Sequence, residues 1–363
     1  MKVQSESMKV LFAAGGSAGH VDPALATAEA VLEIDPSAQI LFLGTHQGIE
    51  SKLVPASGYP LSTIEKLPFP RTLSLATILW PFKALVTLHR TRRIVDDFDV
   101  VVGFGGYISA FAMIAAFLDK KPRIFHEANA LPGLANRLAA RLGALAFASY
   151  PAACTSMKGA RLMSLPLRKS LTHSATSKSL AKSAFGLPEG LPTLLVIGGS
   201  LGARRLNALV ATLVKEDGSQ GYSIIHSLGH GVELPAPTTH YRPLSYIDEM
   251  DIALAAADLV ISRAGAGAVA QISRYEVPAI FIPLWHGNGE QGANASPAVE
   301  VGAALVFKES PEMETQVKGA VSRLMRDESE RTAMRAAFAL LPHSLRSTEG
   351  ANEMAVAIRK SIQ

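Results

Sequence analysis

Two glycine-rich turns, about half a chain apart, constrain this sequence more than any other feature. The first reads AGGSAGHVDPAL at residues 14–25, the second reads GGSLGA at residues 198–203, and each directly follows an apolar run. Where a strand turns sharply into a helix, the first amides lie at the positive end of the helix dipole, and glycine lets an anion approach them. The two copies therefore predict two phosphate-binding turns. Neither copy matches the GxGxxG or Walker pattern, so nicotinamide and ATP chemistry are not indicated.

Apolar runs alternate with segments of helical spacing along the chain. Examples are KVLFAAGG, AQILFLGT, DVVVGFGG and RIFHEAN in the first half, and TLLVIGG, YSIIHSLG and AIFIPL in the second. Strands this uniformly apolar are typical of a parallel sheet with helices on both faces. Because the chain has 363 residues, we expect an α/β protein with two tandem doubly wound, Rossmann-like domains that face each other across a cleft.

The stretch 169–192 is rich in serine, lysine and proline, which is typical of a linker. This places the connection between the two domains at or just before the stretch. We expect one domain over 1–167 and a second over 168–342.

Cys154 is the single cysteine, so no internal disulfide can form, and a cytoplasmic protein is expected. The start of the chain lacks a signal peptide pattern, and the longest apolar run, 107–118, is shorter than the roughly 20 residues that cross a bilayer. The net charge of +4 comes without a basic stripe interleaved with aromatic residues, so no nucleic-acid partner is expected.

Two polar residues after first-half strands are candidate general bases. His20 directly follows the first turn, where a helix N-terminus favours the neutral ring, although a capping or packing role is an alternative. Glu127 lies in FHEANALPG and could act as a base, bind a sugar hydroxyl or complement a helix dipole. In the second half, Gln271 in SRAGAGAVAQI could bind a diol. Gln291 lies in the polar loop PLWHGNGEQGANA. Such a loop suits sugar recognition, and the alternative is a loop that is only solvated.

No metal site is indicated, because the only D-x-D pattern, Asp97-Phe98-Asp99, precedes its strand and so lies at the wrong end for the cleft. A diphosphate would then depend on backbone amides and cations, with Arg168 as a candidate.

The stretch 69–93 combines apolar residues with five cations, which suits an anionic membrane surface or an ordinary amphipathic helix. Proline at position 81 is expected to break the helix and so favours exposure. The residues assigned to this membrane patch are Leu75, Ile78, Leu79, Trp80, Phe82 and Lys83.

Taken together, these stretches resemble the MurG-type N-acetylglucosaminyltransferases of glycosyltransferase family 28, which make lipid II for peptidoglycan. Further matching stretches are GTHQGIESKLVPASGYPL, GFGGYIS, HEANALPGLANRLAAR and YIDEM, all in family order. The resemblance implies the two-domain GT-B architecture, with a last helix, here 343–363, that packs back on the first domain. It also implies inverting transfer of N-acetylglucosamine from UDP-N-acetylglucosamine to the 4-hydroxyl of the muramoyl sugar of lipid I, without a metal or another cofactor.

The same resemblance implies roles for individual residues and for partners. His20 is the first choice for the general base and Glu127 the second. The first domain would bind the acceptor and the cytoplasmic face of the plasma membrane, the second domain would bind the donor, and other cell-wall and division proteins are candidate partners. The implied nucleotide-sugar contacts are Ser17, Ala18, Gly19, Asn129, Arg168, Ser200, Ile247, Ala266, Gly267, Ala268, Val269, Ala270, Gln271 and Gln291.

Five positions depart from the family pattern, the first of which is Ser17 in place of the threonine of the usual GGTGGH turn. Ala18 adds a methyl group where the usual GGTGGH turn has glycine, and Ala128 stands where the family has HEQN. Gln271 replaces a glutamate at the ribose position, which predicts weaker UDP binding because charge-assisted hydrogen bonds are stronger. Glu290 stands where the family has the first of two glutamines, which bears on donor sugar selectivity.

Two other functions fit the same sequence. A UDP-N-acetylglucosamine 2-epimerase has a related two-domain fold, but it would act without a lipid and leaves the 69–93 segment unexplained. A catalytically silent protein that binds the sugar nucleotide as a scaffold is the second alternative.

Overall fold

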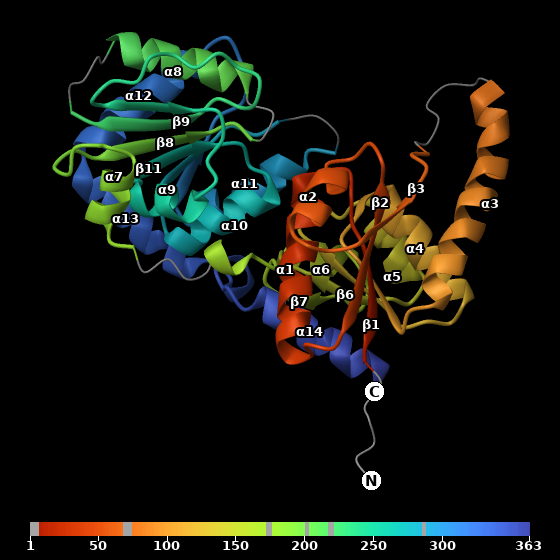
Figure 1. Ribbon diagram of the computed structural model, residues 1–363. Helices are drawn as coiled ribbons and strands as arrows, with labels where there is room; N and C mark the ends of the chain where they lie inside the picture. The colour runs from red at the N-terminus through yellow and green to blue at the C-terminus, as the bar shows by residue number, and fades with distance from the viewer. Residues whose placement is uncertain (1–6, 68–74, 172–175, 200–202, 217–220, 285–287) are drawn as a thin grey trace. The chain divides into compact units, whose positions relative to one another are not determined.

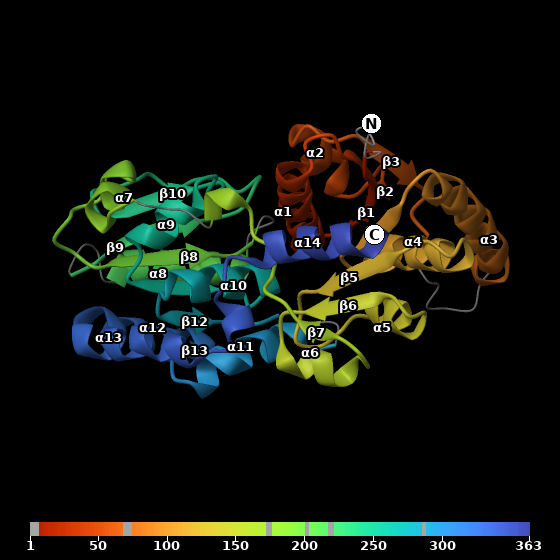
Figure 2. The same ribbon diagram turned by 90° about the horizontal axis from the view of Figure 1, so that it is seen from below.

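The computed structural model describes residues 7–67, 75–171, 176–199, 203–216, 221–284 and 288–363, without the side chains of residues 75–78 and 216. The chain forms two compact units, residues 1–168 with 347–363 and residues 169–346 (Figures 1 and 2). Each unit is a parallel sheet with helices on both faces, which confirms the α/β prediction.

Unit 1 has a seven-stranded sheet in the order β3-β2-β1-β4-β5-β6-β7, and all its strand pairs are parallel. The strands are β1 Lys9–Ala13, β2 Gln39–Thr45, β3 Leu61–Ile64, β4 Val100–Gly103, β5 Arg123–Glu127, β6 Leu145–Ala148 and β7 Arg161–Leu162. The helices are α1 Ala18–Ile34, α2 Glu50–Ala56, α3 Leu75–Asp96, α4 Gly106–Leu118, α5 Leu134–Arg141, α6 Pro151–Ser156 and α14 Gly350–Ile362.

The central strands of unit 1 are buried on both faces because most of their residues are apolar, as in KVLFA of β1 and VVVG of β4. On one face, Phe12 and Phe42 stack with ring centroids 5.2 Å apart and share one apolar core with residues of α1 and α14, two helices that lie side by side in Figure 2. On the other face, Ile108 and Met113 of α4 are fully buried, and α3 and α5 pack against α4. Burial of each large side chain contributes about 2–3 kcal/mol, so the two layers hold the strand ends in fixed positions.

Unit 2 has a six-stranded parallel sheet in the order β10-β9-β8-β11-β12-β13. The strands are β8 Thr193–Ile197, β9 Ser223–Ser227, β10 Tyr241–Leu244, β11 Leu259–Ser262, β12 Ala279–Phe281 and β13 Ala304–Val306. The helices are α7 Lys178–Ala184, α8 Arg204–Glu216, α9 Met250–Ala256, α10 Ala266–Tyr275, α11 Glu290–Glu300, α12 Met313–Arg326 and α13 Glu328–Ala337, with short 3₁₀ turns at Lys169–Leu171, Phe338–Leu340 and His343–Leu345. Residues of α9, α10 and α11 share one apolar core with the sheet, and residues of α8 and α12 share the core on the opposite face.

Both sheets reverse their strand order at one point. In unit 1 the reversal lies between β1 and β4, and in unit 2 it lies between β8 and β11. Loops beyond the carboxyl ends of such strands diverge to opposite faces, and ligands of open α/β sheets bind there. Both glycine-rich turns follow the strand at this point, since one follows β1 and the other follows β8.

Helix α3 differs from the sequence expectation. Its helical conformation runs without interruption from Leu75 to Asp96, so the prediction that Pro81 breaks the helix is wrong. An internal proline removes one hydrogen bond, but turns on both sides can hold a long helix together. Pro81 lies at an exposed position, where water can solvate the carbonyl group that lost its partner.

Candidate active site

His20 lies in the first turn of α1, at the carboxyl edge of the unit 1 sheet. Its Nδ1 is 3.0 Å from the carbonyl oxygen of Gly15 and 3.3 Å from Oγ of Ser17. Since a carbonyl oxygen only accepts, the bond to Gly15 requires the proton on Nδ1 and leaves Nε2 as the unprotonated nitrogen of a neutral ring. The side chain is half-buried. This geometry leaves Nε2 able to accept a proton, and the turn that precedes the helix fixes the orientation of the ring.

The turn after β4 lies against the same ring. A Cβ atom on Gly105, whose φ is +102°, would be 2.9 Å from Nε2 of His20, and one on Gly106 would be 3.1 Å from the carbonyl oxygen of Gly15. Glycine is therefore required in GFGG both by the backbone conformation and by the close approach of the histidine. The loops after two adjacent strands thus form one surface around Nε2.

The glycines of the first turn serve different purposes. Gly16 has φ +87° with open space where a side chain would be, and its N–H donates to Oε2 of Glu50 at 3.0 Å. A Cβ on Gly15 would instead be 2.7 Å from Oε1 of Glu50. The amide of Gly16, which precedes the N-cap Ser17, is taken up by this buried carboxylate, so it is not available to a ligand. Ser17, Ala18 and Gly19 lie on the outer side of the turn, where Ser17 and Gly19 are exposed.

Sequence reasoning missed Glu50. Its side chain is fully buried and accepts from the amide and the hydroxyl of Thr45, at 3.0 and 2.7 Å, as well as from Gly16. The available signal was the recurrence of glycine at positions 44 and 48, because a Cβ at either would collide with the Glu50 side chain.

Glu127 ends β5 and is 3% exposed. Oε1 accepts from the amide and the side chain of Asn129, at 2.9 and 3.1 Å, and Oε2 accepts from the amide of Gly133 and from Asn136 Nδ2, at 3.0 and 2.9 Å. Four donors, from the following loop and from the first turn of α5, saturate the carboxylate. This arrangement favours a role in holding the 127–136 loop, and it leaves His20 better placed for proton abstraction.

Arg168 belongs to unit 1, of which it is the last residue before the connection. Its Nη2 lies 3.5 Å from Oδ1 of Asp22 in α1 and 3.4 Å from Oγ of Ser57 after α2. The guanidinium therefore lies beside the start of α1, two residues from His20 along the helix. The side chain keeps 31% exposure and can reach a ligand there.

In unit 2, the loop after β11 leads directly into α10. Gly265 precedes the helix and Gly267 lies in its first turn, and a Cβ atom on either would meet nothing within 4 Å. None of the described residues crowds these glycines, so within that part of the chain the first turn of α10 presents open backbone at the positive end of a ten-residue helix. Of the residues predicted here, Val269 is buried in the core, whereas Gly267, Ala268, Ala270 and Gln271 are partly exposed and Ala266 is 9% exposed.

Three further predicted contacts follow other strands of unit 2. The side chain of Ile247 is buried in the core, so only its backbone faces the loop after β10. Gln291 begins α11 together with Glu290, and its Oε1 accepts from the amide of Leu284 at 3.0 Å. Ser200 lies outside the described residues, and so does His286 in the polar loop.

A buried histidine lies on β9, where it is paired with Val196 of β8. His226 of β9 contacts Asn207 Oδ1 of α8 through Nε2 at 3.1 Å and the Tyr241 hydroxyl through Nδ1 at 3.1 Å. Asn207 also donates to the carbonyl of Leu228 at 3.0 Å. Burial lowers the pKa of His226 to about 4, so the ring is neutral at physiological pH and acts as a hydrogen-bond bridge.

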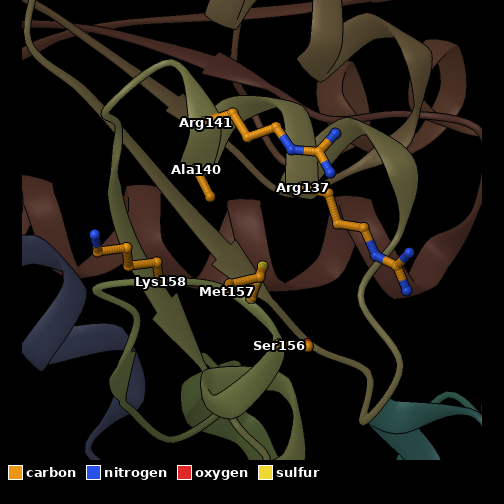
Figure 3. Close-up of a pocket in the computed structure, with 6 residues that line it drawn as sticks. All are labelled: Arg137, Ala140, Arg141, Ser156, Met157 and Lys158. Carbon is orange, nitrogen blue, oxygen red and sulfur yellow. The ribbon is translucent and has the colours of Figure 1, made fainter.

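A pocket of about 560 Å³ lies elsewhere in unit 1, between α5 and the turn after α6. Its cations are Arg137, Arg141 and Lys158. Figure 3 shows both arginine side chains extending to one side and Lys158 extending to the other, so the three charges do not converge on one point. None of the predicted site residues lines this pocket, and we assign no ligand to it.

The predicted membrane patch is in part described. Leu79 and Phe82 are 44% and 67% exposed, Lys83 is exposed and Trp80 is partly exposed. The side chains of Leu75 and Ile78 are not among those that the structure describes. Sequence reasoning missed two more exposed apolar residues of α3, Leu85 and Val86. No helix in the described ranges is both long and apolar enough to cross a bilayer.

Within the described ranges, no three His, Cys, Asp or Glu side chains lie close enough to hold a metal ion together. That transfer proceeds without a metal stays a prediction.

Residues 10–147 match the glycosyltransferase family 28 N-terminal domain, and residues 193–353 match the family's C-terminal domain. This chain belongs to glycosyltransferase family 28. A family 28 relative from a Nocardioides species is 40% identical over 344 residues, covering 92% of this chain and 94% of the relative. One from Nocardia farcinica is 37% identical over 373 residues, covering 99% and 97%. Both are named UDP-N-acetylglucosamine–N-acetylmuramyl-(pentapeptide) pyrophosphoryl-undecaprenol N-acetylglucosamine transferase.

Solved structures agree with the family 28 assignment. The crystal structure of MurG from Acinetobacter baumannii matches with a TM-score of 0.74 and 25% identity, covering 97% of this chain and 99% of that one. The kitacinnamycin glycotransferase matches with a TM-score of 0.72 at 16% identity, covering 99% and 100%, and this similarity concerns the fold alone. The predicted family and its fold are therefore confirmed.

Proposed function

We propose that this protein transfers N-acetylglucosamine from UDP-N-acetylglucosamine to the 4-hydroxyl of the N-acetylmuramoyl sugar of lipid I, the undecaprenyl-diphosphate acceptor, and so forms lipid II. The names of relatives that are about 40% identical over most of the chain support the two substrates. The observation that carries the mechanism is the orientation of His20, whose Nδ1 is held by Gly15 and whose Nε2 lies beside the glycine-rich turn after β4.

In the proposed reaction His20 is the general base. Nε2 takes the proton of the acceptor hydroxyl while the oxygen attacks the anomeric carbon from the face opposite the nucleotide. The bond from the anomeric carbon to the phosphate oxygen breaks, its electron pair leaves with UDP, and the configuration inverts. Positioning of the two substrates and stabilisation of the charge on the leaving group supply most of the rate. No metal or other cofactor takes part in this proposal.

The donor site of the proposal lies on unit 2. The first turn of α10 offers open backbone amides, and Gln271 follows them within the same helix, where its side chain can bind a ribose hydroxyl. Ile247 supplies backbone groups and Gln291 a side chain, while Ser200 would meet the diphosphate. On unit 1, Ser17, Ala18, Gly19, Asn129 and Arg168 would complete the contacts to the sugar nucleotide.

The membrane part of the proposal depends on α3. Exposed Leu79, Phe82, Leu85 and Val86 lie on one helix that also carries Lys83, and an apolar patch with cations suits an anionic lipid surface. The acceptor is itself anchored by its polyprenyl chain, so an enzyme at the cytoplasmic face of the plasma membrane would meet it there. Cell-wall and division proteins at that surface are further candidate partners.

The test is turnover with purified protein. UDP-N-acetylglucosamine and a lipid I analogue should yield UDP and the disaccharide lipid, and addition of a metal chelator should leave the rate unchanged. Conversion of the sugar nucleotide without the acceptor would instead indicate an epimerase. Binding of the donor with no reaction under either condition would indicate a silent scaffold and overturn the proposal.

The variant His20→Ala tests the role of the base. The turnover number should fall by about 10²–10⁴-fold, the usual contribution of general base catalysis. A matched control is His343→Ala, which removes an exposed histidine of unit 2 and should keep the wild-type rate. Equal rates for His20→Ala and wild type would rule out His20 as the base.

A further inference from the structure

Glu50 is a buried carboxylate without a cation partner among the described residues. Its two oxygens accept three hydrogen bonds, from Gly16 N–H, Thr45 N–H and Thr45 Oγ1. A buried charge costs several kcal/mol unless such donors compensate it, so loss of any of the three hydrogen bonds is costly. The carboxylate therefore holds the backbone of Gly16 and Thr45 in one arrangement.

The side chain of Glu50 joins the ends of two strands. Thr45 ends β2, and its hydroxyl also accepts from the amide of Gly48, which fixes the loop that leads into α2. Gly16 belongs to the turn after β1. Glycines at positions 15, 44 and 48 all pack so closely on Glu50 that a Cβ atom there would lie within 2.1 to 2.7 Å of its side chain. Two strand ends and the connecting loop are therefore shaped around one carboxylate.

Gly15 connects the hydrogen bonds around Glu50 to the histidine that is the proposed base. On its inner side Gly15 packs on Glu50, and the next residue, Gly16, donates its amide to Oε2. On its outer side the carbonyl of Gly15 accepts from Nδ1 of His20. A displacement of the turn would move this carbonyl and, with it, both the direction of the ring and the tautomer that leaves Nε2 free.

We propose that Glu50 is a positioning residue for the transfer reaction, which holds the first glycine-rich turn so that Gly15 orients His20. This inference rests on the proposed function, in which His20 is the base. Glu50 does not touch substrate in this proposal and acts only through the turn.

The test is a double-mutant cycle with Glu50→Gln and His20→Ala. The glutamine keeps the shape, but its amide nitrogen would face N–H or O–H donors, so the turn can no longer be held by both oxygens. In the wild-type background Glu50→Gln should lower kcat by about 10–100-fold, the usual effect of losing an orienting partner, with KM for UDP-N-acetylglucosamine within about twofold. In the His20→Ala background the same change should alter kcat by less than about twofold, because the group that it orients is gone.

A matched control separates positioning from general destabilisation. Asp258 of unit 2 is also a largely buried carboxylate that holds a strand, since it accepts from the amide of Thr193 at 2.9 Å and pairs with Lys178. Asp258→Asn should lower the melting temperature and leave kcat of the folded protein unchanged. Equal fractional losses of kcat from Glu50→Gln with and without His20, or no loss in either, would overturn the inference.

Two further measurements keep the inference testable. If Glu50→Gln does not fold, Thr45→Val removes one donor to Oε1 and should lower kcat severalfold only when His20 is present. Amide hydrogen exchange of residues 14–20 requires no turnover, and it should be faster in Glu50→Gln than in Asp258→Asn. Unchanged exchange there would contradict the inference even if the protein transfers a different sugar, whereas faster exchange in an inactive protein would contradict only the proposed function.

Discussion

At the scale of single residues, the orientation of His20 depends on backbone atoms of glycine residues rather than on other side chains. The carbonyl of Gly15 fixes the ring and the turn at Gly105 lies against it, so two short loops define the position of the imidazole. Glycine at these positions is required by contacts inside the protein. At Gly265 and Gly267 the described residues make no such contact, which leaves the backbone open to a ligand on that side.

Gly105→Ala tests the contact with the ring. Its new methyl group would be 2.9 Å from Nε2, so the ring must move, and kcat should fall by about tenfold or more because small displacements in a site are costly. Gly58→Ala is the matched control, because Gly58 also has a positive φ but open space around it. Both variants should lose similar stability on thermal melting. A normal kcat for Gly105→Ala would show that the ring position is not critical.

Gln271→Glu tests the ribose contact. The added charge should tighten UDP binding by about five- to tenfold, because a hydrogen bond to a charged group is worth about 1 kcal/mol more than a neutral one. Isothermal titration with UDP measures the effect. Gln316→Glu places the same charge on an exposed position of α12 and should leave the affinity unchanged. Weaker binding by Gln271→Glu would exclude a direct contact with the ribose.

At the scale of helices and strands, the sequence indicated the inner strands and missed those at the sheet edges. β1, β4, β8 and β11 are apolar at nearly every position because helices cover both faces. The edge strands β3, β7 and β10 are short and partly exposed, and β10 contains a proline, which is tolerated only where one side of a strand lacks a partner. Their sequences therefore have neither the apolar run nor the alternation that marks a strand.

In the candidate site too, the sequence indicated some features and missed others. Residues whose chemistry is visible in the sequence, such as His20, were found from their place after a strand. Glu50 and the saturation of Glu127 were not foreseen, because hydrogen bonds between separate loops depend on strand order, and a single sequence does not state which strand ends are neighbours. Pro81 was misjudged because the turns on both sides sustain α3.

The exposed face of α3 gives a prediction for a whole element. Replacing Phe82 and Leu85 by serine should reduce binding to vesicles that contain anionic lipid by about tenfold or more, since each exposed apolar side chain contributes about 1–2 kcal/mol when a bilayer covers it. Sedimentation with vesicles measures this, and turnover of a water-soluble acceptor should stay normal. Leu180→Ser in α7, which removes a residue of 65% exposure from unit 2, is the control. Unchanged sedimentation of the double variant would exclude α3 as the membrane contact.

At the scale of the whole molecule, each unit contains a buried histidine that resists protonation. Burial lowers the pKa of His126 in unit 1 and of His226 in unit 2 to about 4. The unfolded chain takes up these protons near pH 6.5, so it binds more protons than the folded chain between pH 6.5 and 4. The free energy of unfolding must therefore fall as the pH decreases through this window, by up to about 3 kcal/mol for each histidine.

Urea unfolding at pH 7.5 and pH 5 measures the effect. The midpoint should be clearly lower at pH 5, and His226→Gln should reduce the difference even though it also lowers stability at both values. His89→Gln, which removes an exposed histidine of α3, should keep the wild-type pH dependence. An equal pH dependence for His226→Gln and wild type would show that His226 is protonated in the folded protein.

The packing of α14 on α1 determines the order in which the two units can fold during synthesis. Unit 1 is built from the first 168 residues and the last 17, and Gly350 lies so close to the backbone of Ser164 that a Cβ atom there would be 2.2 Å from its carbonyl oxygen. On the ribosome, every residue of unit 2 has therefore been synthesised before the helix that completes unit 1 emerges. The unit that carries His20 is the first to begin folding and the last to be finished.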